Sequence, residues 1–215
     1  MVINVLHMRR GHWLLLLTLL LAGGGWFWLR PGKASYVNLP PTARGEWVAF
    51  GDSLTQGYGA EEGGDYPNQL AKRLRIKIRN LGVAGNTTAD GLARVDQAVA
   101  LQPRVVLLCL GGNDTLRSVP GDETFANLDA LIDRFHQGGS FVVLLGVRGG
   151  GLTDKKAKRF EQLAQAKRVL LVPNILEGIL FTPSLMADQI HPSDKGYAKI
   201  AERLEVALSP FLPSL

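Results

Sequence analysis

Apolar runs and helical patterns alternate along the chain from Glu46 to its end. Strand-like apolar runs occur at Trp47–Gly51, Ile76–Leu81, Val105–Leu110, Phe141–Val147 and Val169–Val172. Helical patterns lie near Tyr66–Leu74, Ala89–Leu101, Glu123–His136, Asp154–Lys167 and Asp194–Leu208. This alternation predicts parallel βαβ units with helices on both faces of one sheet. Because the strands are continuous apolar runs, we expect both sheet faces to be buried, in a three-layer α/β fold.

The amino-terminal part of the chain has a different pattern. Residues 13–29 carry no charge, and as a helix rising about 1.5 Å per residue they would reach roughly 25 Å, at the short end for crossing a bilayer. Arg9 and Arg10 precede this stretch, and tryptophans lie near both of its ends. It is either an uncleaved membrane anchor or a signal peptide cleaved after its small residues. The apolar stretch resumes at Trp26, which favours the anchor.

These patterns divide the chain into three parts. Residues 1–33 form the anchor or signal segment, residues 34–45 a linker containing Pro40-Pro41, and residues 46–215 a single domain. Arg9 and Arg10 are expected to stay in the cytoplasm. In a Gram-negative cell the domain would then face the periplasm from the inner membrane, or be released into the periplasm if the segment is cleaved.

Charge and cysteine content exclude several classes of function. The formal charge is +5, but Arg9, Arg10, Arg30 and Lys33 supply four of the positive charges and no acidic residue precedes Glu46, which leaves 20 Lys and Arg against 19 Asp and Glu. The domain therefore shows no basic patch for nucleic acid. The one cysteine, Cys109, excludes an intramolecular disulfide and a cysteine-rich metal site. It lies in an apolar run, so we expect a core residue.

Polar or glycine-rich turns follow four of the predicted strands. They are Gly51-Asp-Ser-Leu-Thr-Gln-Gly57, Gly82-Val-Ala-Gly-Asn-Thr-Thr88, Gly111-Gly-Asn-Asp114 and, after the fifth strand, Asp188-Gln-Ile-His191. Open parallel sheets place their ligand sites beyond the carboxyl ends of the strands. We therefore expect these turns to meet around one pocket.

These four blocks occur between Phe50 and Pro192 in the order found in the SGNH (GDSL-type) hydrolases. The chain therefore resembles that family and is similar to its bacterial arylesterases and thioesterase/lysophospholipase esterases. A GDS triplet alone is a weak signal, but GGND and DxxH at the right separations make the resemblance specific. It implies a flavodoxin-like, five-stranded parallel sheet and a covalent acyl-enzyme mechanism. It also implies that no metal or organic cofactor takes part.

A serine, a histidine and an aspartate carry the chemistry that the resemblance implies. Ser53 needs a base to become a nucleophile, and His191 can take its proton at neutral pH. Asp188 would fix the tautomer of His191 and stabilise the imidazolium. The other histidines precede the membrane segment or fall at a helix end. Thr55 stands where a G-x-S-x-G elbow needs its second glycine, so the α/β-hydrolase fold is excluded.

The resemblance also implies an oxyanion hole for the tetrahedral intermediate. Its donors would be the backbone N–H groups of Ser53 and Gly85 and the side-chain amide of Asn113. A glycine at position 85 supports this assignment independently of the resemblance, because a residue without a Cβ lets the substrate approach the backbone closely.

Several of the polar residues also have simpler interpretations. Ser53 alone would fit a helix N-cap, but with the other blocks present we interpret it as the nucleophile. Asp52 and Asp114 are expected to be hydrogen-bonding residues of their turns. Asp194 is expected to cap the last helix, and His136 to lie at the surface near a helix C-terminus.

The predicted function is hydrolysis of short- to medium-chain acyl esters, with thioesters and lysophospholipids as further substrates. The alternatives are deacetylation of an O-acetylated cell-envelope glycan, a flavodoxin-like module that binds phosphate or flavin, and a catalytically silent scaffold. Gly149-Gly-Gly151 stands where related thioesterases carry bulkier residues. We therefore expect a mobile, open rim there, and the substrate range is left undetermined.

Overall fold

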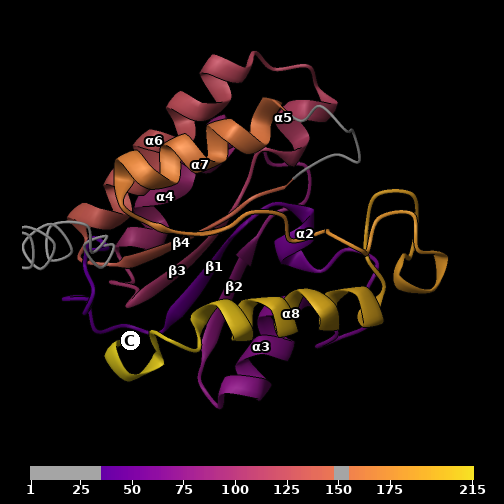
Figure 1. The fold of residues 1–215 in the computed structure, drawn as a ribbon, viewed down its shortest axis with the longest axis horizontal. Helices are drawn as coiled ribbons and strands as arrows, with labels where there is room; N and C mark the ends of the chain where they lie inside the picture. The colour runs from indigo at the N-terminus through magenta and orange to yellow at the C-terminus, as the bar shows by residue number, and fades with distance from the viewer. Residues whose placement is uncertain (1–34, 148–154) are drawn as a thin grey trace, which may run out of the picture. The chain divides into compact units, whose positions relative to one another are not determined.

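A parallel β-sheet forms the centre of the domain in this computed structural model, which describes residues 35–147 and 155–215. Within that part the sheet has five strands in the order β2-β1-β3-β4-β5 (Figure 1). They are β1 (Trp47–Gly51), β2 (Ile78–Gly82), β3 (Val105–Cys109), β4 (Phe141–Leu145) and β5 (Leu170–Val172). Every neighbouring pair is parallel. This is the flavodoxin-like order, and it confirms the predicted fold class.

Helices cover both faces of the sheet. One face is covered by α4 (Thr88–Val99), α6 (Gly121–Gln137) and α7 (Lys155–Lys167), and the other by α3 (Tyr66–Leu74) and α8 (Asp194–Leu208) (Figure 1). Two buried apolar clusters fill the space between the layers, one against each face. Short helical turns complete the chain: α2 (Ser53–Gln56), α5 (Gly112–Leu116), η1 (Pro183–Leu185) and η2 (Leu212–Ser214). The sequence had not predicted these turns.

Burial differs between the central and the edge strands. All residues of β1, β3 and β4 are buried, as their apolar runs predicted. The expectation of continuous burial was wrong for β2, which starts two residues later than predicted and exposes Arg79. An edge strand has a neighbour on one side only, so it tolerates polar residues. Asn80, one of these polar residues, donates a hydrogen bond to the backbone oxygen of Thr55 at 2.7 Å, and this bond connects β2 to α2.

Two expectations about polar side chains were also wrong. The N-cap position of α8 is Ser193, and Asp194 accepts a hydrogen bond from the backbone N–H of Glu61 at 3.0 Å instead of capping its own helix. His136 lies in the last turn of α6 but is half-buried. Its Nε2 is buried with no hydrogen-bond partner in the part of the chain that the structure describes, and burial lowers the pKa of His136. Tertiary packing, which helix periodicity does not report, decides both cases.

The packed chain begins earlier than residue 46. Tyr36 contacts Phe141 and Phe211 edge to face, with ring centroids 5.9 and 5.3 Å apart. Asn38 donates hydrogen bonds to the backbone oxygens of His136 and Ser140. The stretch expected to be a linker therefore packs on the domain from Tyr36 onward. The predicted segment of residues 1–33 lies outside the described residues, among which no helix is long and apolar enough to span a membrane.

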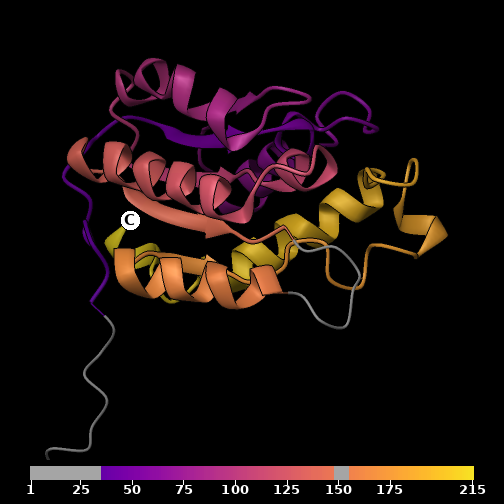
Figure 2. The same cartoon turned by 90° about the horizontal axis from the view of Figure 1, so that it is seen from above.

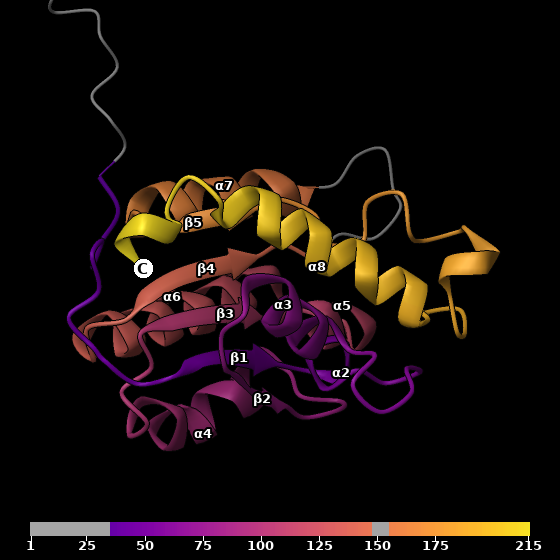
Figure 3. The same ribbon diagram turned by 90° about the horizontal axis from the view of Figure 1, so that it is seen from below.

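The strands all end at the edge of the sheet where the predicted site lies. The segment between β5 and α8 extends beyond this edge, and the first described residues and the carboxyl terminus lie at the opposite end (Figure 2, Figure 3). Close approach of the backbone at this edge depends on Gly82. A Cβ at Gly82 would lie 2.1 Å from the backbone nitrogen of Gln56 in α2.

We expect Gly82→Ala to lower the free energy of unfolding by about 1–3 kcal/mol, because a methyl group forces β2 and α2 apart. Gly138→Ala is the matched control: Gly138 has φ −74°, and its added Cβ would meet nothing closer than 3.4 Å. Urea denaturation followed by circular dichroism measures both. Equal midpoints for the two variants would contradict the role given to Gly82.

Candidate active site

Ser53 is presented by a tight turn directly after β1. It is the first residue of α2, and Asp52 at the N-cap accepts a hydrogen bond from the backbone N–H of Leu54 at 3.0 Å. Gly57, in the left-handed region at φ 89°, ends this helical turn. The short turn fixes Ser53 at the carboxyl end of a central strand.

The structure brings Ser53, His191 and Asp188 into one chain of hydrogen bonds. The Oγ of Ser53 lies 3.0 Å from Nε2 of His191, and Nδ1 of His191 lies 2.8 Å from Oδ2 of Asp188. A carboxylate can only accept, so Nδ1 carries the proton and Nε2 is free to accept from the serine. These are the contacts that a nucleophile, its base and an orienting carboxylate require.

Asp188 is held by the backbone as well as by His191. Its Oδ1 accepts from the N–H groups of Ile190 and His191, each at 2.7 Å. The hydrogen bond from the His191 ring, helped by these backbone N–H groups, lowers the pKa of Asp188 to about 2. The carboxylate therefore stays charged at neutral pH and is exposed to solvent behind the imidazole.

Tyr58 packs on the imidazole and was missed by the sequence analysis. The ring centroids of Tyr58 and His191 lie 4.6 Å apart at an interplanar angle of 44°. The backbone oxygen of Tyr58 accepts a hydrogen bond from the Tyr197 hydroxyl of α8 at 2.9 Å. Nothing in the local sequence signals this contact, because it joins the loop after α2 to the loop before α8.

Gly85 and Asn113 lie on the pocket that also contains Ser53 and His191. Gly85 has φ +79°, a left-handed conformation that favours glycine, and its carbonyl accepts from Nη2 of Arg117 at 2.7 Å. Asn113 projects from the first turn of α5, and its Nδ2 donates to the backbone oxygen of Asn86 at 3.0 Å. All five residues predicted for the site are therefore near one another.

Arg94 of α4 braces the turn after β2 and was also missed. Its Nε donates to Oδ1 of Asn86 at 2.7 Å, and its Nη2 donates to the backbone oxygen of Gly51 at 2.8 Å. The guanidinium lies 4.0 Å from the ring centre of Phe50. Arg94 thus joins the turn that carries Gly85 to the end of the strand that precedes Ser53.

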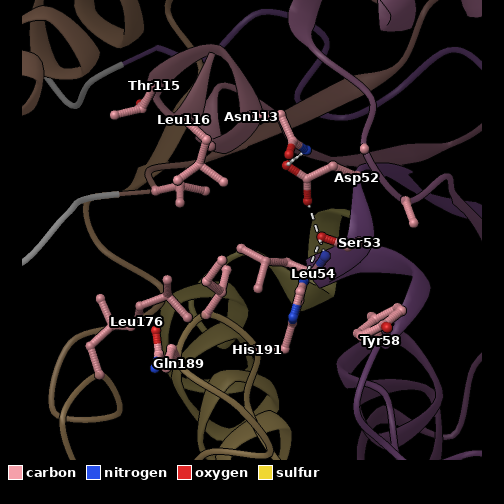
Figure 4. Close-up of a pocket in the computed structure, with 16 residues that line it drawn as sticks. Asp52, Ser53, Leu54, Tyr58, Asn113, Thr115, Leu116, Leu176, Gln189 and His191 are labelled. Atoms are coloured by element: carbon pink, nitrogen blue, oxygen red, sulfur yellow. Dashed lines mark hydrogen bonds between the residues drawn. The ribbon is translucent and has the colours of Figure 1, made fainter. Parts of the chain in front are cut away.

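The pocket beside Ser53 is a cavity of about 360 Å³. Figure 4 shows Ser53 and His191 on one wall, Asn113 and Asp52 next to them, and Leu116 and Leu176 across the cavity. Apolar side chains make up much of the remaining lining, which consists of Leu54, Leu116, Val147, Leu176, Leu180 and Ile190. This combination of a few convergent polar groups and an apolar wall is typical of a small-molecule site.

The structural interpretations of three further residues are consistent with their contacts. Cys109 is fully buried in β3. Asp114 is buried and accepts from both the backbone N–H and the hydroxyl of Thr88. Asp52 is 2% exposed, and burial raises its pKa to about 7. The glycines 149–151, expected to form an open rim, lie outside the described residues.

Comparisons with known proteins support the family and the fold. The GDSL-like Lipase/Acylhydrolase family matches residues 49–199. An arylesterase from Vibrio mimicus is 31% identical over 167 residues, which are 72% of this chain and 84% of that protein. Thioesterase 1/protease 1/lysophospholipase L1 of Escherichia coli K12 is 29% identical over 77% of this chain and 84% of that protein. The crystal structure of AlinE4, an SGNH-hydrolase family esterase, has a TM-score of 0.62 and 32% identity and covers 80% of this chain and 97% of its own.

The Asp188 carboxyl is expected to titrate with a midpoint near 2, below the ordinary 3.8, because His191 and the backbone stabilise its charged form. Above about pH 4 it stays ionised, so Asp188 contributes nothing to any change between about pH 5 and pH 7. Carboxyl ¹³C NMR measures the midpoint. It should rise toward 3.8 in His191→Ala, and a midpoint at or above 3.8 in the unaltered protein would contradict this arrangement.

Proposed function

Because the chain belongs to the GDSL-like lipase/acylhydrolase family, we propose that it hydrolyses acyl esters through an acyl-enzyme formed on Ser53. The observation that carries the assignment of residues is the unbroken chain from Ser53 Oγ through the His191 ring to Asp188. A helix-capping serine has no need of a histidine at 3.0 Å, and a flavodoxin-like binding module has no need of the carboxylate behind it.

In the first half of the reaction, the Oγ of Ser53 attacks the ester carbonyl while Nε2 of His191 takes its proton. The resulting imidazolium is stabilised by the Asp188 carboxylate, which stays charged. His191 then returns the proton to the leaving alcohol, and the acyl group remains on Ser53. In the second half, water attacks the acyl-enzyme carbonyl as His191 takes its proton, and His191 then returns that proton to Oγ of Ser53 as the acid leaves.

The tetrahedral intermediates carry a negative oxygen that needs fixed donors. We assign this role to the backbone N–H groups of Ser53 and Gly85 and to Nδ2 of Asn113, which border the same cavity. The left-handed backbone of Gly85 supports the assignment, as does the bracing of the adjacent Asn86 by Arg94. Donors held in place before the reaction cost no reorganisation when the charge develops.

The lining of the cavity favours an acyl chain over a sugar. Leu116, Leu176 and Leu180 offer apolar surface but no hydrogen bonds, whereas a glycan would need polar partners for its hydroxyl groups. Short- to medium-chain acyl esters fit this wall better than an O-acetylated envelope glycan. The activities named for the relatives extend the proposed range to aryl esters, thioesters and lysophospholipids.

We also propose that residues 13–29 hold the chain at the inner membrane with the domain in the periplasm, or direct it there if they are cleaved. The support is the charge-free apolar stretch behind Arg9 and Arg10. Extraction of membranes with alkaline carbonate separates the two fates. An anchored chain stays in the pellet at full mass, a cleaved one is released and shorter, and a full-length chain in the cytosolic fraction would refute both.

A fluorophosphonate is expected to label the full chain at Ser53, because Oγ displaces fluoride from phosphorus as His191 takes its proton. Mass spectrometry of proteolytic peptides locates the adduct. Labelling in His191→Ala should slow by about 10³-fold or more, whereas His136→Ala, a histidine outside the pocket, should label at the rate of the unaltered protein. An adduct on another residue, or equal labelling of the two variants, would refute the assignment.

A further inference from the structure

Asp52 occupies a buried position between the turn that carries Ser53 and the turn that carries Asn113. Its Oδ1 accepts from the backbone N–H of Leu54 at 3.0 Å, which accounts for one oxygen as a helix cap. Its Oδ2 lies 3.5 Å from Nδ2 of Asn113, and Figure 4 shows these two side chains facing each other. The mechanism above gives this second oxygen no role.

The carboxamide of Asn113 has two orientations that differ by exchange of its nitrogen and oxygen. In the observed orientation, Nδ2 faces two acceptors, the backbone oxygen of Asn86 at 3.0 Å and the carboxylate of Asp52 at 3.5 Å. When Asp52 is ionised, as it is at pH 8, the exchanged orientation would place Oδ1 against both of these oxygens with no hydrogen between them. The two acceptors therefore select the orientation in which Asn113 presents N–H groups on the side of Ser53.

The two contacts differ in strength. At 3.0 Å the bond to Asn86 is of ordinary length, whereas 3.5 Å is at the outer limit for a hydrogen bond. The N–H of Asn113 that is directed at Asp52 thus makes only a weak hydrogen bond. It can donate to an oxyanion instead at little cost in free energy. A residue in this position orients the donor without competing strongly for it.

We propose that Asp52 is a positioning residue for ester hydrolysis, one that keeps the nitrogen rather than the oxygen of the Asn113 carboxamide at the oxyanion position. The proposal rests on the proposed function, because it assumes that Asn113 belongs to the oxyanion hole. Asp52 lines the cavity but is assigned no bond-forming step, and it acts through Asn113.

The stability of an Asp52 variant can distinguish a positioning role from a purely structural one, because Asp52 is buried. Its pKa in the folded protein is raised to about 7, above the ordinary 3.8. Folding therefore becomes less favourable as pH rises from about 4 to 7, and above pH 7 the full cost of burying the charge is present. Asn at this position keeps an oxygen for the Leu54 N–H and carries no charge. Asp52→Asn should therefore be at least as stable as the unaltered protein at pH 8.

The test is a double-mutant cycle with the full chain and a chromogenic acyl ester at pH 8. Asn113→Ala should lower kcat by about 10²–10³-fold with little change in KM, since the contact exists only in the transition state. Asp52→Asn places an amide N–H against Nδ2 of Asn113 and favours the exchanged orientation. It should lower kcat by about 10- to 100-fold, again with KM nearly unchanged. The double variant should be no slower than Asn113→Ala alone.

Asp65→Asn is the matched control. Asp65 is also a buried N-cap carboxylate, accepting from the backbone N–H of Asn68 at 2.9 Å, but it does not line the pocket. Its kcat should stay within about twofold of the unaltered protein, in keeping with a change outside the site.

Three outcomes would overturn the proposal for Asp52 alone: unchanged kcat in Asp52→Asn, a double variant slower by the product of the two single effects, or a clear loss of thermal stability in Asp52→Asn at pH 8. An inactive unaltered protein would instead overturn the proposed function. Full activity in Asn113→Ala would overturn both the oxyanion assignment and the role of Asp52.

Discussion

The hydrogen bond between Ser53 and His191 joins residues 138 positions apart, and the rest of the site depends on it. Ser53 follows the central strand β1, whereas His191 follows β5 at the edge of the sheet. The chain returns from that edge because α8 packs beside α3. Tyr197 of α8 bonds to the backbone of Tyr58, and Gln69 of α3 donates to the backbone oxygen of Asp194 at 3.0 Å. Helix packing on one face of the sheet thus sets the position of the imidazole.

The other half of the site is built from turns between the strands and the opposite helix layer. Arg94 on α4 fixes the turn after β2 by donating to Oδ1 of Asn86, and the backbone oxygen of Asn86 accepts an amide hydrogen of Asn113. Asp52 links the turn after β1 to the turn after β3. The oxyanion donors and the nucleophile are consequently held in place by the same central strands. These strands are buried along their whole length. Rigid support of this kind is what preorganised stabilisation of charge requires.

The sequence predicted the fold because it follows from local patterns, whereas the candidate site residues came from motifs in the strand-end turns and from their resemblance to the SGNH hydrolases. Apolar runs located the central strands, and parallel strands leave their carboxyl-end turns at one edge. Other features depend on contacts between distant segments. Arg79 and Asn80 make β2 more exposed than the predicted strand at Ile76–Leu81, since an edge strand need not be apolar. Tyr58 and Arg94 act through residues far along the chain, and Asp194 bonds to Glu61 instead of its own helix. Such contacts are set by packing, which single-sequence periodicity does not contain.

The most direct test of this arrangement is a crystal structure of the protein inhibited by an alkyl phosphonate, whose tetrahedral phosphorus imitates the intermediate. We expect phosphorus bonded to Oγ of Ser53 and its free oxygen within about 2.7–3.1 Å of the N–H groups of Ser53 and Gly85 and of Nδ2 of Asn113. The alkyl chain should lie along Leu116 and Leu176. A free oxygen directed to solvent, with Asn113 and Gly85 out of reach, would contradict the convergence of these turns on one reacting centre.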